Sequence, residues 1–387
     1  MYRQIQHYRD NLSLTLNSSL PTLDLPRNGL LSRILLRFNA TQTGATPFRS
    51  VSTGKWRIVD FLDAIAFRVN GSIDIVNLPG DILQYEAFLS QGITAFDLIR
   101  EYSNASQRCD VLINMGDYMW DPDHFFDLSL VDNPELIFTQ SLASTQWASA
   151  NVDVFLGWFR DAAVRAAPNF YKRETWAKWT TAQDETKYWE LPTGLPIARI
   201  IMQPRPAAST AGVVACNPND LMYDLKLSFK NKVISVFDAD WIELARQNYV
   251  ELGYEQLTHG TVYHAADYYF DVGLGEVRGV AAISGARDGA VSSVVPTREG
   301  DQSYPTQKLE SYEADSPTDF IARGIGYHNC AAFLFQTPWL AGEALDPSDA
   351  GYGTVELEVH TKNSSSAASG TNRIALIRPT SMSQLAR

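Results

Sequence analysis

Cysteine and long apolar runs are scarce in this chain of 387 residues. The 3 cysteines, Cys109, Cys216 and Cys330, lie far apart and are odd in number, so they cannot form a disulfide framework or a CxxC metal site within one chain. We expect three small buried side chains there. No apolar run reaches the roughly 18 residues of a membrane span, and residues 1–14 lack the apolar core of a signal peptide.

Positive charge is also in deficit. Lysine and arginine total 32 against 44 aspartates and glutamates, which gives a net charge of −12. A protein that coats nucleic acid needs clustered cations to neutralise phosphates, so we expect no direct nucleic-acid binding. The 9 tryptophans and 17 tyrosines, by contrast, suit β structure.

Motifs for catalysis are missing as well. The sequence has no GxSxG, HExxH or P-loop motif and no GxGxxG after a strand. A metal enzyme on two β-barrels needs clustered histidines, but His259 and His264 are five positions apart and would point to opposite faces of a strand. The other histidines are scattered, at His7, His124, His328 and His360. We therefore predict that the chain is not an enzyme and has no catalytic, cofactor-binding or metal-binding residues.

Two short acidic segments are the best candidates for a bound calcium ion. One contains Asp121, Asp123 and His124, and the other contains Asp346 and Asp349. Short acidic loops supply the oxygen ligands that calcium prefers. Aspartate and proline are also ordinary turn residues because of their backbone geometry, and we favour acidic turns at both places.

The feature most typical of this sequence is a long internal repeat. Residues 24–26 and 31–36 (DLP and LSRILL) match residues 190–192 and 197–202 (ELP and IARIIM) without a gap, 166 positions apart. Alternating apolar residues before Asn70-Gly71 reappear before residues 231–232, 160 positions later. A period near half the chain length indicates two copies of one domain.

Each copy reads as strand, loop, hairpin and helix start. The segments 30–38 and 196–203 carry large apolar residues on both faces, so we expect cover on both sides of these strands. Asp81 is predicted to cap a helix, with Gln84 reaching back to it, and Asp240 and Glu243 are predicted to do the same 159 positions later. Many further short strands separated by turn residues follow, which favours an all-β fold.

Arg33 and Arg199 are the polar position that both copies share within an apolar strand. Two interpretations stay open for them. Either arginine could pair with a carboxylate at a contact between barrels or subunits, or its stem could simply lie over apolar neighbours at the surface.

The repeat and the composition give predicted boundaries. Residues 1–20 are polar and are predicted to be an N-terminal arm, with a short amphipathic helix allowed over Ile5–Leu12. The first domain is expected at 21–172, a linker at 173–187, and the second domain at 188–387. Within the second domain, 284–319 is rich in Gly, Ser, Asp and Thr and is predicted to be a long surface loop.

In these features the chain resembles the double jelly-roll major capsid proteins of tailless icosahedral viruses with an internal membrane, the tectivirus-like lineage of bacteriophages. The twin openings Leu23–Leu36 and Trp189–Met202, the helices expected at Asp81 and Asp240, the polar N-terminus and the length carry this resemblance.

The resemblance implies two tandem eight-stranded jelly-roll β-sandwiches, each with a short helix after an early hairpin. It implies a homotrimer that forms pseudo-hexagonal capsomers of an icosahedral shell, with 284–319 as a tower on the outside and the arm beneath. Neighbouring capsomers, minor capsid or vertex proteins and an underlying viral membrane would be its partners. The protein would be made in the host cytoplasm and located in the virion.

One other class of function is open on the sequence. Two β-sandwiches also suit a carbohydrate-binding or adhesive protein, such as a virion spike. Exposed aromatic residues in loops, for example Trp339 and Tyr352, would then stack on sugars. A purified trimer would favour the coat protein, and a monomer that binds glycans would favour the adhesive protein.

Overall fold

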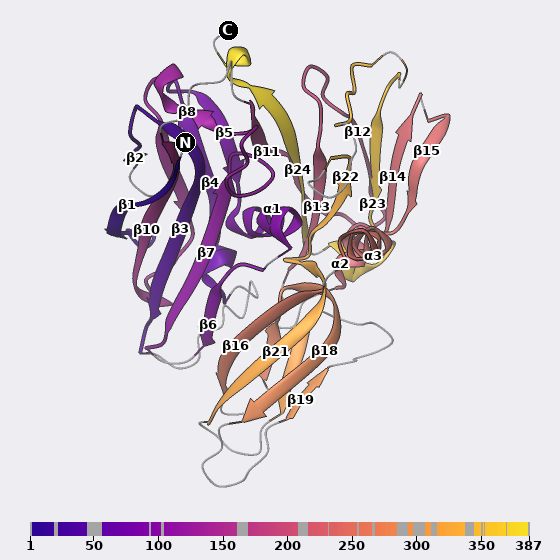
Figure 1. Ribbon diagram of the computed structural model, residues 1–387. Coiled ribbons are helices and arrows are strands. Elements are labelled where there is room, and N and C mark those ends of the chain that lie inside the picture. The colour runs from indigo at the N-terminus through magenta and orange to yellow at the C-terminus, as the bar shows by residue number, and fades with distance from the viewer. Residues whose placement is uncertain are drawn as a thin grey trace.

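The computed structural model describes residues 2–18, 22–44, 56–92, 94–101, 104–160, 169–207, 216–230, 232–253, 255–264, 268–284, 293–296, 306–310, 316–336, 344–349, 351, 353–368 and 370–385. Strands dominate these residues, and Figure 1 shows them in a broad upper body with a narrower lobe below it. The predicted all-β class is confirmed. None of the helices in these ranges is both long and apolar enough to cross a membrane.

The largest sheet contains strands from both halves of the chain. Its nine strands lie in the order β1-β10-β3-β7-β6-β16-β21-β18, with β8 beside β3. Their bounds are β1 Tyr2–Ser13, β10 Trp147–Arg160, β3 Leu30–Gln42, β7 Ser106–Asn114, β6 Asp97–Glu101, β16 Gln256–His264, β21 Ser316–Tyr327, β18 Leu274–Ser284 and β8 Phe126–Asp127.

The second sheet also runs through both halves. Its eight strands have the order β2-β9-β4-β5-β11-β24-β13-β22. They are β2 Leu23–Asp24, β9 Glu135–Gln140, β4 Leu62–Val69, β5 Ile73–Leu78, β11 Asn169–Thr180, β24 Gly370–Ser381, β13 Arg199–Pro206 and β22 Ala331–Leu334.

Two smaller sheets belong to the second half. One has the order β12-β23-β14-β15, formed by Thr186–Glu190, Glu356–His360, Asp224–Phe229 and Ile234–Ala239. The other has the order β17-β20-β19, formed by Tyr268–Asp271, Thr306–Glu310 and Ser293–Pro296. The α-helices among the described residues are α1 (Gly80–Gln91), α2 (Pro218–Leu221) and α3 (Trp241–Leu252), and short 3-10 turns are η1 Ile58–Phe61, η2 Leu128–Leu130, η3 Ser365–Ala368 and η4 Met382–Gln384.

The two halves repeat one topology. The order β2-β9-β4-β5 in the first half matches β12-β23-β14-β15 in the second, and β1-β10-β3 matches β11-β24-β13. Strand β15 begins 161 positions after β5, and α3 begins 161 positions after α1. Both helices have 12 residues, and each ends at a left-handed glycine, Gly92 or Gly253. The duplication inferred from the sequence is therefore visible in three dimensions.

Local sequence explains the hairpin that precedes α1. Asn70 and Gly71 have φ values of 52° and 74°, the positive pair that a type I′ turn requires. This turn lets β4 and β5 pair antiparallel, with Ile65 opposite Leu78. The hairpin predicted in the first copy is thus confirmed.

Parallel strand pairs join the halves. In one sheet β5 pairs parallel with β11, where Val76 lies opposite Arg173, and in the other β6 pairs parallel with β16, where Ile99 lies opposite Gly260. One apolar core cluster extends from the first half to residues of β13 and β24, including Ile201 and Ile377. The halves are therefore fused by both sheets and by shared core packing.

The N-terminal segment differs from its prediction. Residues 2–13 form strand β1, antiparallel to β10, so the amphipathic helix over Ile5–Leu12 is wrong. Most side chains of β1 are exposed, and the strand lies at the edge of its sheet. Without a buried face, its sequence lacks the apolar alternation by which strands are recognised.

The predicted linker is also mostly strand. Residues 173–180 belong to β11 and residues 186–187 to β12, so little of 173–187 is free of the sheets. Strand β11 has 12 residues, as β1 does, and occupies the matching position beside β24. The structure thus begins each half with a long strand, β1 at the edge of its sheet and β11 between β5 and β24; the exact domain boundaries stay a prediction.

The segment 284–319 is described in part. Its described residues include β19, β20 and the start of β21, so it contains strands where a loop was predicted. Figure 1 shows β16, β18, β19 and β21 in the lower lobe, below the upper body. Residues 285–292, 297–305 and 311–315 of the predicted loop lie outside the described residues.

Candidate functional site: the polar seam around helix α1

Helix α1 is buried on all sides. All of its residues except Gln91 are buried, including the polar Asp81, Gln84, Glu86 and Ser90. A surface helix normally keeps its polar side in water, and a buried charge is costly unless it is paired. The partners of these side chains come largely from the second half, and we call this set of contacts the polar seam.

Glu86 is the centre of the first part of the seam. Its Oε1 atom accepts from Arg173 Nη2 at 3.1 Å and from Arg199 Nη1 at 3.0 Å. Arg199 also pairs with Asp117, whose Oδ2 atom accepts from the Tyr171 hydroxyl at 2.8 Å. Two arginines thus face two carboxylates, and this balance is what allows all four charges to be buried.

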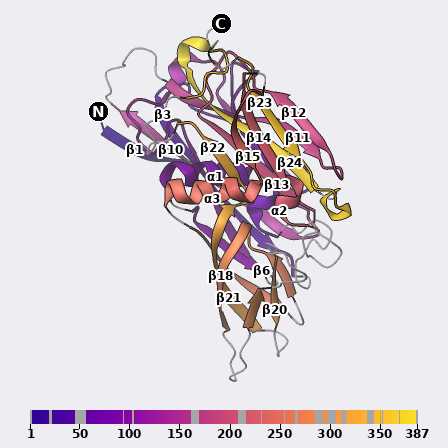
Figure 2. The ribbon, with the colours of Figure 1, turned by 90° about the vertical axis from the view of Figure 1, so that its right-hand side faces the viewer.

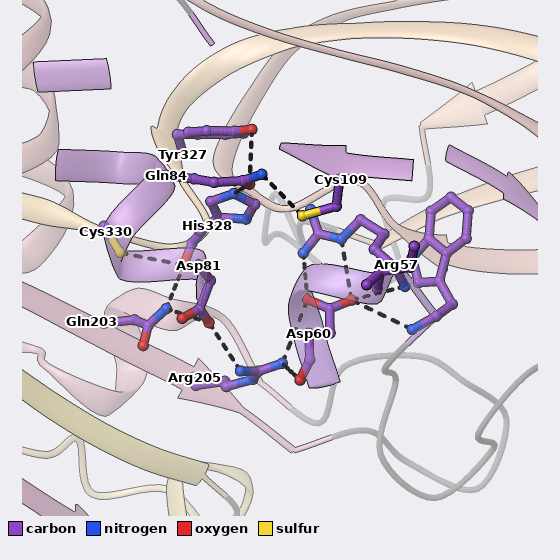
Figure 3. Close-up of polar contacts among 12 residues, drawn as sticks. Arg57, Asp60, Asp81, Gln84, Cys109, Gln203, Arg205, Tyr327, His328 and Cys330 are labelled. Atoms are coloured by element: carbon purple, nitrogen blue, oxygen red, sulfur yellow. Dashed lines mark hydrogen bonds and ion pairs between the residues drawn. The ribbon is translucent and has the colours of Figure 1, made fainter. Parts of the chain in front are cut away.

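Asp81 is the centre of the second part, shown in Figure 3. Its Oδ2 atom accepts from Gln203 Nε2 at 2.9 Å and from Arg205 Nη1 at 3.0 Å, and Arg373 Nη1 lies 3.6 Å away. Burial by itself would raise the pKa of Asp81, but Arg205 and Arg373 hold that pKa below its ordinary value. Asp81 therefore stays ionised between the two halves.

Asp60 extends this part toward the 3-10 turn η1. Its carboxylate lies 2.8 Å from Arg57 Nη2 and 3.5 Å from Arg205 Nη2. Burial opposes ionisation, yet Arg57 and Arg205 bring the pKa of Asp60 far below its usual range. Arg205 thus bridges the two carboxylates Asp60 and Asp81, which lie on different elements of the first half.

Gln84 connects two titratable side chains of the seam, Asp97 and His328. Its Nε2 atom donates to Asp97 Oδ1 at 2.9 Å, and its Oε1 atom lies 2.6 Å from His328 Nε2. Burial lowers the pKa of His328 to about 3, with Arg57 acting in the same direction. Burial also raises the pKa of Asp97 to about 7. The seam therefore contains a neutral His328 and an Asp97 whose pKa lies near neutral pH.

The repeated arginines have different environments. Arg199 is fully buried in the seam, so its interpretation as a contact between the halves is confirmed. Arg33 is half-buried, with its guanidinium 5.8 Å from the centre of the Trp120 ring and its stem over Gly157. Among the described residues Arg33 has no salt bridge to a carboxylate.

The helix caps agree with only part of the prediction. Asp240 caps α3 by accepting from the Glu243 backbone N–H at 3.2 Å. Pro79, not Asp81, is the N-cap of α1, and Gln84 makes no cap bond, so the predicted capping box at Asp81 is wrong. The helices align at 161 positions, two more than the sequence match suggested.

In both acidic segments, aspartate side chains accept hydrogen bonds from backbone N–H groups of the same turn. Asp121 accepts from the backbone N–H of Asp123 at 3.0 Å and lies 2.9 Å from His124 Nδ1. Asp346 and Asp349 each accept a backbone N–H two residues later, at 2.9 and 2.8 Å. These are the contacts of acidic turns, and whether either segment binds calcium stays untested.

Other candidates are placed as follows. The three cysteines are buried and free, as predicted. Trp339 and Tyr352 lie outside the described residues. In the described part of the chain, His7, Asp10 and Asp153 bring three possible ligand atoms within 4.8 Å of one another, on exposed or half-exposed side chains. His7 and Asp153 come together only because β1 pairs with β10, which the sequence did not predict.

The sequence also did not identify the seam. Glu86, Arg173, Arg205 and Arg373 are far apart in the chain and belong to no motif. One signal was available: Glu86 lies between apolar neighbours in a helix whose other positions are mostly apolar. A charge in such a place must have a buried partner.

Comparisons with known proteins bear on the fold. No protein-family model matches the sequence, and no curated protein matches it. Among solved structures, the major capsid protein of Sulfolobus turreted icosahedral virus is similar with a TM-score of 0.59 and 10% identity, covering 98% of this chain and 97% of that one. The major capsid protein P2 of bacteriophage PM2 gives a TM-score of 0.51 at 10% identity, covering 98% of each chain. The capsid of the virus PBCV-1 gives 0.51 at 11% identity, covering 98% and 94%. The fold is therefore the double jelly roll of these capsid proteins.

Proposed function

We propose that this chain is a structural major capsid protein that assembles as trimers into pseudo-hexagonal capsomers of an icosahedral viral shell. The observation that carries the proposal is the double jelly roll itself, since the likeness to viral capsid proteins extends over almost the whole chain. Fold alone does not fix function. Here the duplicated halves and the buried polar seam add the rigid two-barrel unit that such a capsomer needs.

The remaining parts of the proposal follow from that role. The protein acts in the virion after synthesis in the host cytoplasm, and it has no enzymatic activity. Other capsomers, minor capsid or vertex proteins and the viral membrane are its partners. The lower lobe, which includes part of 284–319, is the proposed tower. The described position of β1 within a sheet gives no support to an arm beneath the shell.

Electron microscopy and light scattering on the purified chain test this function. We expect a mass of three chains in solution and three-fold particles with a hexagonal outline in negative stain. A strict monomer at all concentrations, with no ordered assembly, would contradict the proposal. Glycan binding by that monomer would support the adhesive alternative, which the comparisons do not favour.

A further inference from the structure

Among the described residues, two strand edges have no pairing strand although their counterparts in the repeat are paired. Strand β15 is the last strand of the four-stranded sheet, and β1 is the last strand of the nine-stranded sheet. Their counterparts in the repeat, β5 and β11, pair with each other in parallel. Figure 1 shows β1 and β15 at opposite sides of the upper body. An exposed strand edge is a template for pairing with another chain.

The outer side of α3 is exposed where the matching side of α1 is buried. At the offset of 161, Tyr85, Glu86, Leu89 and Ser90 of α1 correspond to Arg246, Gln247, Val250 and Glu251 of α3. The four α1 residues are buried in or beside the polar seam, whereas the four α3 residues are exposed. Val250 in particular is 77% exposed, although Leu89 is fully buried. Figure 2 shows α3 on the side of the molecule that faces the viewer.

The edge strand beside α3 shows the same contrast. Val236 of β15 is 52% exposed, and its counterpart in β5, Ile75, is fully buried. Ile234 is exposed as well. We define the α3 face as Arg246, Gln247, Val250 and Glu251 together with strand β15. Exposed apolar side chains beside an open strand edge are typical of an interaction surface.

We propose that the α3 face of one copy docks on the outer side of β1, β10 and β3 of a second copy, and that β15 pairs in parallel with that copy's β1. The contact would repeat between chains the arrangement by which α1 and β5 meet β11, β24 and β13 within one chain. This inference rests on the proposed function, because it assigns the surface by which the capsomer assembles.

The charges of the two surfaces fit this docking. In the seam, Arg199 Nη1 donates to Ser90 Oγ at 3.3 Å and pairs with Glu86 and Asp117. The counterpart of Arg199 is Arg33, which lacks a carboxylate partner among the described residues. The counterpart of Ser90 is Glu251, an exposed carboxylate. Docking would therefore place Glu251 of one copy against Arg33 of the next.

The receiving surface also has apolar side chains. Ile5 of β1 is 54% exposed and lies opposite Gly157, the residue that pairs with Arg33 across β10 and β3. Phe155 is half-buried and stacks on His7, with the ring centres 4.4 Å apart. Apolar side chains beside Arg33 match the α3 face, where Val250 lies next to Glu251.

The contact joins two different surfaces of the chain, so each copy can receive one neighbour and dock on another. Such head-to-tail contacts close into a ring when the rotation between copies allows it and otherwise give open filaments. Within one chain the same contact already relates two similar barrels. A closed ring of three chains would contain six barrels with six similar contacts, three internal and three between copies.

Charge reversal at the proposed pair is the sharpest test. We expect Arg33→Glu and Glu251→Arg each to weaken the trimer about tenfold or more, because like charges then face each other. The double variant should recover the assembly in analytical ultracentrifugation, because it restores opposite charges. Circular dichroism and the melting temperature of the monomeric fraction check that each variant folds.

A matched pair of exposed valines provides the control. Val250→Arg should dissociate the trimer, whereas Val233→Arg should not. Val233 is 80% exposed in the β14–β15 turn, and its counterpart Ser72 stays exposed in the first half. Neither valine is needed for folding, since both side chains are in solvent.

Cysteine cross-linking gives an independent result. A chain carrying both Arg33→Cys and Glu251→Cys should form disulfide-linked dimers and trimers on a non-reducing gel, and one carrying Arg33→Cys and Val233→Cys should not. Trimers that persist in Arg33→Glu, Glu251→Arg and Val250→Arg would overturn the docking while leaving the proposed function intact. A wild-type chain that never forms trimers would instead contradict the proposed function.

Discussion

Arg33 and Arg199 show how one residue position can acquire two roles after duplication. Both follow the same short motif, but Arg199 is enclosed by Glu86 and Asp117 and Arg33 faces the outside. The seam around α1 supplies the difference, because only the second barrel has a first barrel packed against this strand within the chain. The guanidinium chemistry is unchanged, and the environment determines what it contributes.

Replacing each arginine by alanine should separate these roles. Arg199→Ala leaves Glu86 and Asp117 buried without their shared cation, which typically costs about 3–5 kcal/mol. Arg33→Ala should cost the monomer about 1 kcal/mol or less, because its charge is half-exposed and unpaired among the described residues. Urea unfolding of the two variants measures the difference. Equal losses of unfolding free energy in the two variants would show that the buried ion pairs of Arg199 add no stability.

Asp97 should make the stability depend on pH. Its folded-state pKa of about 7 exceeds the ordinary value of 3.8, so the folded chain holds this proton more tightly than the unfolded chain. The contribution of Asp97 to the free energy of unfolding is therefore complete below about pH 4 and falls as the pH rises to 7, by about 4 kcal/mol in all.

Asp97→Asn removes this dependence. The amide oxygen can still accept from Gln84, so the gain in stability of the variant over the wild type should be larger at pH 8 than at pH 5. Thermal unfolding at both pH values checks this. A difference between variant and wild type that is the same at pH 5 and pH 8 would show that the carboxyl is not titrating in this range.

At the scale of single residues, the sequence identified important positions better than the residues that they contact. The shared arginine and the cap at Asp240 were found because each belongs to a short local pattern. The cations around Asp81 were not found, because Arg205 and Arg373 approach it only after distant strands pair. Contacts between residues more than a hundred positions apart leave no local signal in one sequence.

The two α-helices show the same divergence at the scale of an element. They have equal length and equivalent ends, but α1 is buried on every side and α3 keeps a solvent face. Stability of α1 therefore comes mainly from the seam, whereas α3 depends more on its cap and on one apolar side formed by Trp241, Leu244 and Ala245.

The cap of α3 can be tested directly. Asp240→Ala removes the acceptor for the Glu243 backbone N–H and a bond from Asn219 Nδ2 at 3.0 Å, so we expect a loss of about 1 kcal/mol. Asp238→Ala, two residues earlier, is the control: its carboxylate is about half-exposed and pairs with Lys226 at the surface. Chemical denaturation of both variants should show a loss for the first only. Equal effects would indicate that charge near the helix start matters more than the cap.

Strands β1 and β11 mark the limit of strand prediction from pattern. Both have 12 residues and carry many polar side chains, so residues 1–20 were predicted to be an arm and 173–187 a linker. Alternation of apolar and polar residues arises only where one face is buried. Strands β3 and β13 were predicted well because they carry many buried apolar side chains.

On the scale of the whole molecule, the sequence predicted duplication but not fusion. The repeat indicates two barrels, and the shared strand order of the two halves agrees with it. The repeat does not reveal that each of the two large sheets continues from one barrel into the other through a parallel strand pair. Those pairs involve few residues, and they depend on how the barrels meet rather than on any segment's own pattern.

The fusion of the two barrels should couple their unfolding. Proteins of two domains often unfold in separate steps, because few contacts cross the boundary. In this chain both large sheets cross it, one core cluster lies on both sides of it, and buried ion pairs bridge it. Opening either barrel alone would expose Glu86, Arg173 and Arg199 at once.

We therefore expect the whole chain to unfold in one cooperative transition, with a calorimetric enthalpy equal to the van't Hoff enthalpy. Glu86→Gln, which leaves two buried arginines short of a carboxylate, should lower the midpoint of that transition by several degrees without splitting it. Differential scanning calorimetry at low protein concentration, where monomers prevail, measures both quantities. Two resolved transitions in the wild type, of which Glu86→Gln moves only one, would show that the barrels are energetically separate and that the seam packs them together without coupling their stability.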